Sequence, residues 1–279
     1  MKVMIIGAGT MGAGIAQVFA QSGEVSGVYL TDISAELAEN GKRRIEKALN
    51  RLVTKERITR QYADDILAKI VPGVKEIGAD ADWVIEAAKE EMSVKRSLFS
   101  ALDEIVRDDA VFSTNTSSLS ITALSAGLKH PLVGMHFFNP APVMKLVEVV
   151  SGALTPPEVT ERAAQLVASL GKEPVRVKDA PGFVVNRLLI PMINEAVFLL
   201  SEGTASAKDV DTAMKLGANH PMGPLELCDL IGLDIVLAIM QTIQTETGDE
   251  KYRPAPLLLE MVAAGKLGRK SGEGFFSYQ

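Results

Sequence analysis

Histidine is the side chain best suited to exchange a proton near neutral pH, and the sequence contains three: His130, His136 and His220. His130 and His220 each precede a proline, which is typical of turn residues. His136 ends an apolar stretch and could act as the base that removes a hydroxyl proton during hydride transfer. Taken alone, such a histidine is more often a core residue bonded to the backbone, so its role depends on the rest of the sequence.

A glycine-rich turn near the N-terminus predicts a phosphate-binding site. The pattern G-x-G-x-x-G lies between a short apolar run and a segment with helical spacing. In that context the glycines permit a tight turn, a close approach of pyrophosphate and close packing of helix on strand. The pyrophosphate would bind the free N–H groups at the helix N-terminus. The residues assigned to this site are Gly7, Gly9, Thr10, Met11 and Gly12.

The next acidic residue of interest is Asp32, at the end of the second predicted strand. A carboxylate about 20 residues beyond the glycine turn accepts a hydrogen bond from the ribose 2′-hydroxyl of NAD. Asp32 would repel the 2′-phosphate of NADP, and the following Ile33 and Ser34 offer no arginine to bind it. The sequence therefore predicts NAD as the preferred cofactor.

The first 180 residues alternate between strand and helix patterns, and these elements must position the side chains above. Apolar runs without alternation are typical of strands buried on both faces of a parallel sheet. Strands are expected at 3–6, 28–31, 83–85, 110–113, 132–138, 146–150 and 174–177. Helices are expected at 10–21, 34–52, 94–106 and 158–170. This order predicts an α/β Rossmann-type dinucleotide-binding domain with a doubly wound sheet.

From Pro181 onward the patterns are helical only, which predicts an all-α C-terminal domain. Helices are expected at 182–200, 207–216, 225–243 and 255–264. The predicted domains are therefore a Rossmann-like NAD-binding domain, 1–180, and a helical domain for substrate binding and dimerisation, 181–279. Apolar side chains on the first of these helices suggest a self-complementary surface and a homodimer. They are Leu188, Leu189, Met192, Ile193 and Val197.

The composition excludes several classes of protein. The 279 residues are 47% hydrophobic and 23% charged, which is ordinary for a globular chain. A net charge of −6 without a basic stripe argues against nucleic-acid binding. No apolar stretch reaches the ~18 residues of a membrane span, and none resembles a signal peptide. The single cysteine, Cys228, is expected to be a small buried hydrophobe; it permits no internal disulfide or cysteine zinc site. We therefore expect no bound metal and a cytoplasmic protein, or the mature form of an organellar one.

Five stretches of the chain are long and specific enough to indicate a family. They are Asn115–Leu119 (NTSSL), Gly134–Val149 (GMHFFNPAPVMKLVEV), Pro181–Arg187 (PGFVVNR), Met214–Pro224 (MKLGANHPMGP) and Gly268–Phe275 (GRKSGEGF). In content and order they resemble the 3-hydroxyacyl-CoA dehydrogenase family over essentially the whole chain, and the length looks most like the bacterial 3-hydroxybutyryl-CoA dehydrogenases. The resemblance implies an NAD-dependent enzyme that interconverts an (S)-3-hydroxyacyl-CoA and a 3-ketoacyl-CoA.

The resemblance also implies roles for four catalytic residues. His136 would be the base in oxidation and the acid in reduction. Glu148 would pair with its other ring nitrogen, where a carboxylate fixes the tautomer and stabilises the imidazolium. Ser117 and Asn186 would hydrogen-bond the reacting oxygen or the thioester carbonyl of the acyl-CoA substrate.

Further residues match positions of the family that contact the cofactor or coenzyme A. Glu90 and Lys95 match positions near the ribose and nicotinamide end of NAD, and Asn115 belongs to the same cofactor set. Lys55 falls where the family presents a lysine to the phosphates of coenzyme A. An exposed, solvated lysine is the alternative interpretation of Lys55.

Three other functions stay open. A β-hydroxyacid dehydrogenase of another family would use a catalytic lysine, for which Lys215 is the candidate, but it would leave His136 and Glu148 without a role. A sugar-acid dehydrogenase could be built on the same framework. A non-catalytic NAD-binding protein is the third, and an intact set of Ser117, His136, Glu148 and Asn186 argues against it.

Overall fold

A computed structural model describes residues 1–278, and the chain divides into two units, Met1–Asp179 and a second that begins at Ala180. Each unit has a hydrophobic core of its own. The last residue of the predicted 181–279 domain lies outside the described residues.

The first unit is built on a sheet with the strand order β3-β2-β1-β4-β5-β6-β7-β8. The strands are β1 (Lys2–Ile6), β2 (Gly27–Thr31), β3 (Ile70–Gly73), β4 (Trp83–Glu86), β5 (Val111–Thr114), β6 (Leu132–Phe137), β7 (Leu146–Ser151) and β8 (Glu173–Lys178). Neighbouring strands pair in parallel, except that β6 and β7 are antiparallel. The order reverses between β1 and β4, where Rossmann-type sheets bind a dinucleotide.

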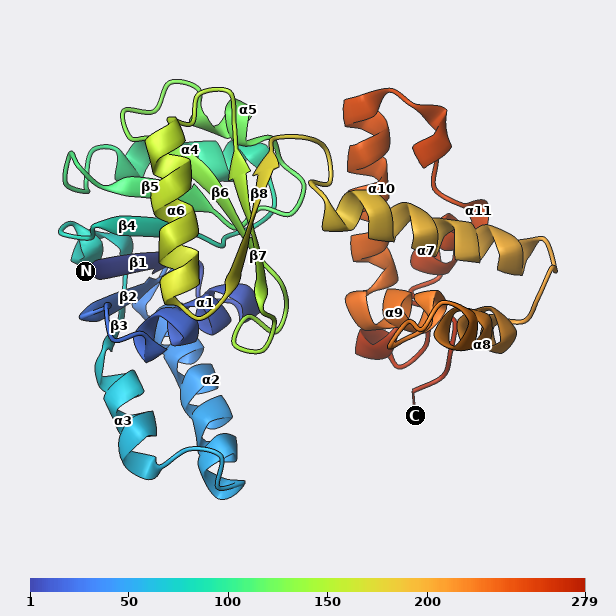
Figure 1. Ribbon diagram of the computed structural model, residues 1–279, viewed down its shortest axis with the longest axis horizontal. Helices are drawn as coiled ribbons and strands as arrows, with labels where there is room; N and C mark the ends of the chain where they lie inside the picture. The colour runs from blue at the N-terminus through green and yellow to red at the C-terminus, as the bar shows by residue number, and fades with distance from the viewer. Residues whose placement is uncertain (279) are drawn as a thin grey trace. The chain divides into compact units, whose positions relative to one another are not determined.

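Helices cover both faces of this sheet. They are α1 (Thr10–Gln21), α2 (Ala35–Thr54), α3 (Arg60–Ala68), α4 (Met92–Leu102), α5 (Ile121–Ser125) and α6 (Pro157–Ser169), with a 3₁₀ turn η1 (Lys75–Gly78). The helix α6 crosses one face, whereas α2 and α3 lie side by side and project beyond the edge of the sheet (Figure 1). On the face of α1 the ring of Phe19 contacts Phe137, and on the opposite face Phe99 of α4 stacks on Phe112 of β5.

Alternation along β6 and β7 decides which of their side chains meet. Phe137 and Val147 belong to the core formed with α1 and α6. Because successive strand residues point to opposite faces, His136 and Glu148 point to the other face, on which α5 lies. The apolar pattern of the two strands thus places both polar side chains on one face.

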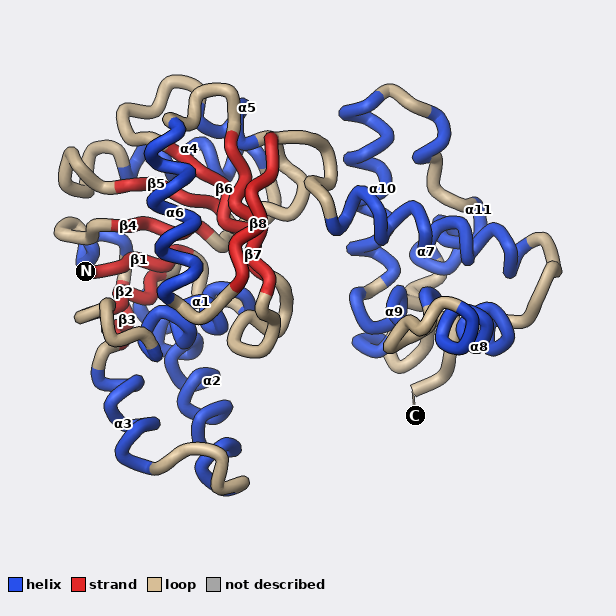
Figure 2. Tube along the Cα trace, viewed as in Figure 1, coloured by secondary structure: helices blue, strands red, loops and turns tan. Residues whose placement is uncertain are grey.

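The second unit consists of helices joined by loops and short turns (Figure 2). The helices are α7 (Val185–Ser201), α8 (Ala207–Gly217), α9 (Pro224–Ile231), α10 (Leu233–Thr247) and α11 (Pro256–Ala263), with 3₁₀ turns η2 (Glu250–Tyr252) and η3 (Arg269–Ser271). Cys228 is fully buried in its core, as predicted, and burial raises the pKa of its thiol. The fold class is therefore confirmed as a Rossmann-type α/β unit followed by a helical one.

Some elements differ from the sequence predictions. The helix α3 and the strand β3 were not expected, since Arg60–Ala68 is short and polar and β3 is an edge strand that contains Pro72. The single helix expected over 225–243 is two helices, because Gly232 has a φ of 106° and breaks the backbone bonding between them. The helix α4 begins and ends earlier than the predicted 94–106.

Candidate active site

The glycine turn between β1 and α1 has the geometry of a phosphate cradle. Gly7 has a φ of 94°, and a Cβ there would lie 2.5 Å from the carbonyl oxygen of Ala87. A Cβ on Gly12 would lie 1.7 Å from the Gly7 oxygen, whereas nothing lies within 4 Å of one on Gly9. Gly9 therefore leaves open space in front of the first turn of α1, whose N–H groups have no partner inside the helix. The surface fits the pyrophosphate of a dinucleotide.

Asp32 follows β2 and borders the same turn. Its Oδ2 accepts a 2.7 Å hydrogen bond from the Ala8 N–H, and its Oδ1 accepts one of 2.8 Å from the Ile33 N–H. Asp32 lines a surface hollow with Gly9 and with cations of α2 that sequence reasoning did not place beside it. These cations are Arg43, Arg44 and Lys47. Helical spacing along α2 was the only sign of their shared face.

His136 and Glu148 lie opposite each other in the register of β6 and β7. The Nδ1 atom of His136 is 2.7 Å from Oε2 of Glu148, and the two side chains are 7% and 1% exposed. The Glu148 carboxylate can accept a hydrogen bond from Nδ1–H, which would fix the tautomer of the His136 ring. The ring of Phe138 contacts the His136 ring at 4.5 Å between centroids. The arrangement is that of a general base held by an orienting carboxylate.

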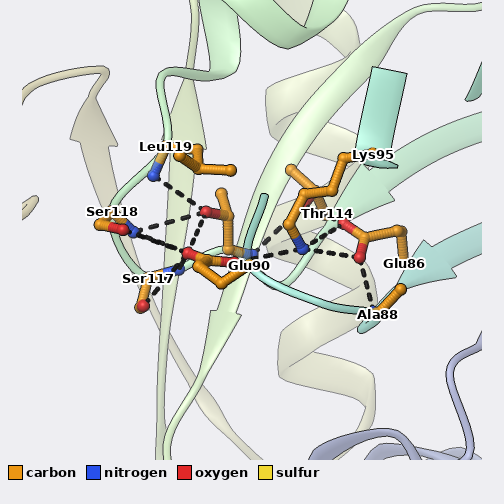
Figure 3. Close-up of polar contacts among 9 residues, drawn as sticks. Glu86, Ala88, Glu90, Lys95, Thr114, Ser117, Ser118 and Leu119 are labelled. Atoms are coloured by element: carbon orange, nitrogen blue, oxygen red, sulfur yellow. Dashed lines mark hydrogen bonds and ion pairs between the residues drawn. The ribbon is translucent and has the colours of Figure 1, made fainter. Parts of the chain in front are cut away.

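Glu90 organises the loop that follows β5. Its Oε1 accepts hydrogen bonds from the Thr116 hydroxyl, from the N–H and hydroxyl of Ser117, and from the N–H and hydroxyl of Ser118 (Figure 3). Burial of the Glu90 carboxyl raises its pKa, but the charge of Lys95 and the bonds from Thr116 and Ser117 outweigh that effect, so the pKa is lowered. Glu90 is predicted to contact the cofactor and Ser117 the substrate, and the two residues contact each other.

Lys95 is a buried residue of α4 with three carboxylate oxygens around its Nζ. The distances are 2.6 and 2.8 Å to the oxygens of Glu86 and 3.2 Å to Oε2 of Glu90. Glu86, at the end of β4, was not identified from the sequence. Glu86 also accepts bonds from the hydroxyl of Thr114 and the N–H of Ala88, which joins the ends of β4 and β5.

The other predicted site residues are distributed over both units. Asn115 follows β5, and its Oδ1 accepts a 2.8 Å bond from the N–H of Phe137, next to His136. Lys55 caps the C-terminus of α2. Asn186 is a buried residue in the first turn of α7, and Lys215 lies in α8, both in the second unit.

Two family models together match nearly the entire chain. Residues 2–180 match the NAD binding domain of 3-hydroxyacyl-CoA dehydrogenase, and residues 182–278 match its C-terminal domain. The chain belongs to the 3-hydroxyacyl-CoA dehydrogenase family. As a member of this family it is an NAD-binding oxidoreductase.

Relatives within the 3-hydroxyacyl-CoA dehydrogenase family are similar over the full length. A 3-hydroxybutyryl-CoA dehydrogenase of Clostridioides difficile is 49% identical, with 100% of this chain and 99% of the relative aligned. The mitochondrial hydroxyacyl-coenzyme A dehydrogenase of Homo sapiens is 40% identical over 99% of this chain and 91% of the relative. The crystal structure of (S)-3-hydroxybutyryl-CoA dehydrogenase from Ralstonia eutropha superposes with a TM-score of 0.94 at 46% identity, covering 100% of this chain and 99% of that one.

Within residues 1–278, no group of three or more histidine, cysteine or acidic residues is arranged to hold a metal ion. No helix in that part of the chain is long and apolar enough to span a membrane.

Proposed function

We propose that the chain is an NAD-dependent dehydrogenase that interconverts (S)-3-hydroxybutyryl-CoA and acetoacetyl-CoA. The observation that carries the proposal is the 2.7 Å contact between His136 and Glu148, because it supplies the base that alcohol oxidation needs. The names of the relatives favour a short acyl group on coenzyme A.

In oxidation, Nε2 of His136 takes the proton of the 3-hydroxyl group as its oxygen becomes a carbonyl. Nδ1 keeps its proton and donates it in a hydrogen bond to Glu148, whose charge stabilises the imidazolium that forms. In the reverse direction, the imidazolium of His136 returns the proton to the oxygen of the 3-keto group. Because both side chains are nearly buried, this charge pair is weakly screened by water.

The cofactor would lie along the carboxyl ends of the parallel strands. Gly7, Gly9, Gly12 and the α1 N–H groups of Thr10 and Met11 would hold the pyrophosphate, and Asp32 the adenosine ribose. When bound, NAD accepts the hydride from the substrate carbon in oxidation and, as NADH, donates it in reduction. Glu90, Lys95 and Asn115 would form the nicotinamide side.

The substrate would bind through its thioester and through its phosphates. Ser117 and Asn186 are proposed to hydrogen-bond the reacting oxygen or the thioester carbonyl. Lys55 is proposed to bind the coenzyme A phosphates, and a row of cations on the same face of α2 supports this role. That row is Arg43, Lys47, Arg51 and Lys55, four residues apart on the helix.

The function is tested by measuring NADH oxidation with 3-ketoacyl-CoAs of increasing chain length, beside free acetoacetate. We expect turnover with acetoacetyl-CoA and little with the free acid. Faster turnover of free hydroxyacids or ketoacids would favour the lysine-dependent enzymes and Lys215. A flat absorbance trace with every substrate would favour a non-catalytic NAD-binding protein.

We also propose that the protein is a cytoplasmic homodimer that associates through its second unit. The fully buried lone Cys228 suits a reducing compartment. Of the apolar side chains predicted to form the interface, Ile193 and Val197 belong instead to the core of the unit. The proposed interface therefore rests on exposed side chains such as Leu188 and Leu216, which are 70% and 82% exposed.

A further inference from the structure

The topology of the sheet indicates which strands border each half of a bound dinucleotide. The strand order reverses between β1 and β4, and the pyrophosphate cradle follows β1. Asp32 places the adenosine half beyond β2, on one side of this point. The nicotinamide half must then extend over the ends of β4 and β5, on the other side. Glu86 and Thr114 are the last residues of these two strands.

Three charged side chains meet at this position: Glu86, Lys95 and Glu90 (Figure 3). We name them the acidic triad. Glu86 is 0% exposed and Lys95 is 1% exposed, whereas Glu90 is 38% exposed and faces the loop that carries Ser117. Lys95 therefore lies between the buried carboxylate of Glu86 and the partly exposed carboxylate of Glu90.

The hydrogen bonds around the acidic triad fix its charge. The Lys95 ammonium donates to both oxygens of Glu86, and the Ala88 N–H and the Thr114 hydroxyl donate one further bond each, which are the contacts of a carboxylate. Glu90 likewise accepts at both oxygens. Two carboxylates and one ammonium leave one net negative charge. The neighbouring exposed pair of Lys89 and Glu91 adds none.

The same contacts limit what Lys95 can do. An ammonium group has three hydrogens to donate, and three carboxylate oxygens lie within 3.2 Å of Nζ. Lys95 thus has no further donor to offer a cofactor unless it gives up one of these contacts. It acts as a positioning residue for Glu90, and Glu86 positions Lys95.

We propose that the net negative charge of the acidic triad sets the preference of the site for the oxidised over the reduced cofactor. The nicotinamide ring carries a positive charge in NAD⁺ and none in NADH, so a nearby negative charge stabilises the oxidised form alone. This inference rests on the proposed function for the position of the cofactor. It adds a role for Glu86, a residue that contacts neither cofactor nor substrate, in the thermodynamics of hydride transfer.

The test is the ratio of the dissociation constants of NAD⁺ and NADH, measured by calorimetry without acyl-CoA. Glu86→Gln and Glu90→Gln each make the triad neutral, so both should raise the ratio Kd(NAD⁺)/Kd(NADH) by about three- to tenfold. The double variant Glu86→Gln/Lys95→Met removes one charge of each sign and keeps the net negative charge. Its ratio should stay within about twofold of the wild type.

The ratio separates the charge effect from damage to the fold or to a ribose contact, because such damage weakens both forms of the cofactor equally. Glu91→Gln is the matched control, since it removes an exposed, screened charge from the residue next to Glu90 in the chain and should leave the ratio unchanged. If Glu86→Gln does not fold, Glu90→Gln and the double variant still decide the matter.

An unchanged ratio in Glu90→Gln, or a double variant that behaves like Glu86→Gln, would overturn the inference and leave the proposed function intact. Failure of the wild type to bind either form of the cofactor would overturn the proposed function together with the inference. Normal cofactor binding without turnover of acetoacetyl-CoA would contradict the proposed function alone.

Discussion

His136 and Glu148 are directly opposite residues of the antiparallel strands β6 and β7, and Nδ1 of the histidine lies 2.7 Å from Oε2 of the glutamate. Twelve residues separate them in the chain, and they meet because the turn between the strands returns the chain in register. The sheet thus orients the His136 ring, since both side chains stand on strands rather than on loops.

Asp32 should control the choice between NADH and NADPH. Asp32→Ala removes the carboxylate that repels a 2′-phosphate and leaves Arg43, Arg44 and Lys47 in the same hollow. We expect the ratio of kcat/KM for NADH to kcat/KM for NADPH to fall by about tenfold or more. Adding Arg43→Ala should reverse part of the gain with NADPH. A wild-type preference for NADPH, or a ratio unaffected by Asp32→Ala, would contradict this assignment.

Glu90 should make the stability of the folded protein depend on pH in the acidic range. Its pKa is lowered in the folded chain, so its contribution to the free energy of unfolding is present above the ordinary glutamate pKa and is lost as the pH falls through the folded-state pKa. The Tm of the wild type should therefore exceed that of Glu90→Gln at pH 7, and the difference should shrink only as the pH falls below the ordinary glutamate value of 4.5. A difference in Tm that stays constant or grows on acidification would show that the sign is wrong.

Asp229 should hold the C-terminal segment to the second unit. The buried carboxylate accepts 2.9 Å bonds from the N–H groups of Phe275 and Phe276 and from the hydroxyl of Tyr278. Asp229→Ala leaves these donors without an acceptor, which we expect to cost about 3 kcal/mol and to lower the Tm by about 5 °C.

The matched control for Asp229→Ala is Asp234→Asn, which loses an exposed pair with Lys270 and should change the stability by less than about 0.5 kcal/mol. Equal Tm values for the two variants would show that the C-terminal segment does not depend on Asp229. Susceptibility of the segment to carboxypeptidase gives an independent measurement.

If the protein dimerises through its second unit, a charge at an exposed apolar residue of that unit should disrupt the dimer. Leu216→Glu places a charge where we expect the partner subunit, and sedimentation velocity should then show a monomer at micromolar concentration. Leu154→Glu, at an exposed leucine of the first unit, should remain dimeric. A wild type that sediments as a monomer would remove the proposal of a dimer.

The order of strands and helices could be predicted from the sequence because strands buried on both faces have continuous apolar runs, as in β1 and β4. The edge strand β3 was not predicted, because Val71 is exposed and Pro72 interrupts the apolar pattern of a buried strand. The division between α9 and α10 was not predicted, because Gly232 adopts a positive φ inside an otherwise continuous helical pattern.

A motif or a family position predicted His136, Glu148 and Glu90 as site residues, and the structure places His136 against Glu148 and Glu90 against Ser117. The role of Glu86 could not be predicted from the sequence, because a single acidic residue at the end of an apolar strand resembles a solvated strand end. Its burial depends on Lys95, nine residues further along and inward-facing on α4, and on Thr114 of a neighbouring strand. Such a cluster follows from tertiary packing and leaves no local pattern.

We propose that His136 and Glu148 work as one catalytic unit. His136→Ala removes the base and should lower kcat by about 10²–10⁴-fold. Glu148→Gln keeps the size of the side chain but removes the charge that stabilises the imidazolium, so kcat should also fall. NAD affinity should change little in either variant, because the pyrophosphate binds at the turn that precedes α1.

The most direct test is kcat with acetoacetyl-CoA for the wild type, both single variants and the double variant. If Glu148 acts only through His136, the double variant should be about as slow as His136→Ala alone, since groups that act as a unit are strongly non-additive. Fully multiplicative losses would contradict the claim and give Glu148 a separate role. A near-normal kcat in His136→Ala would remove the mechanism and return Lys215 to consideration.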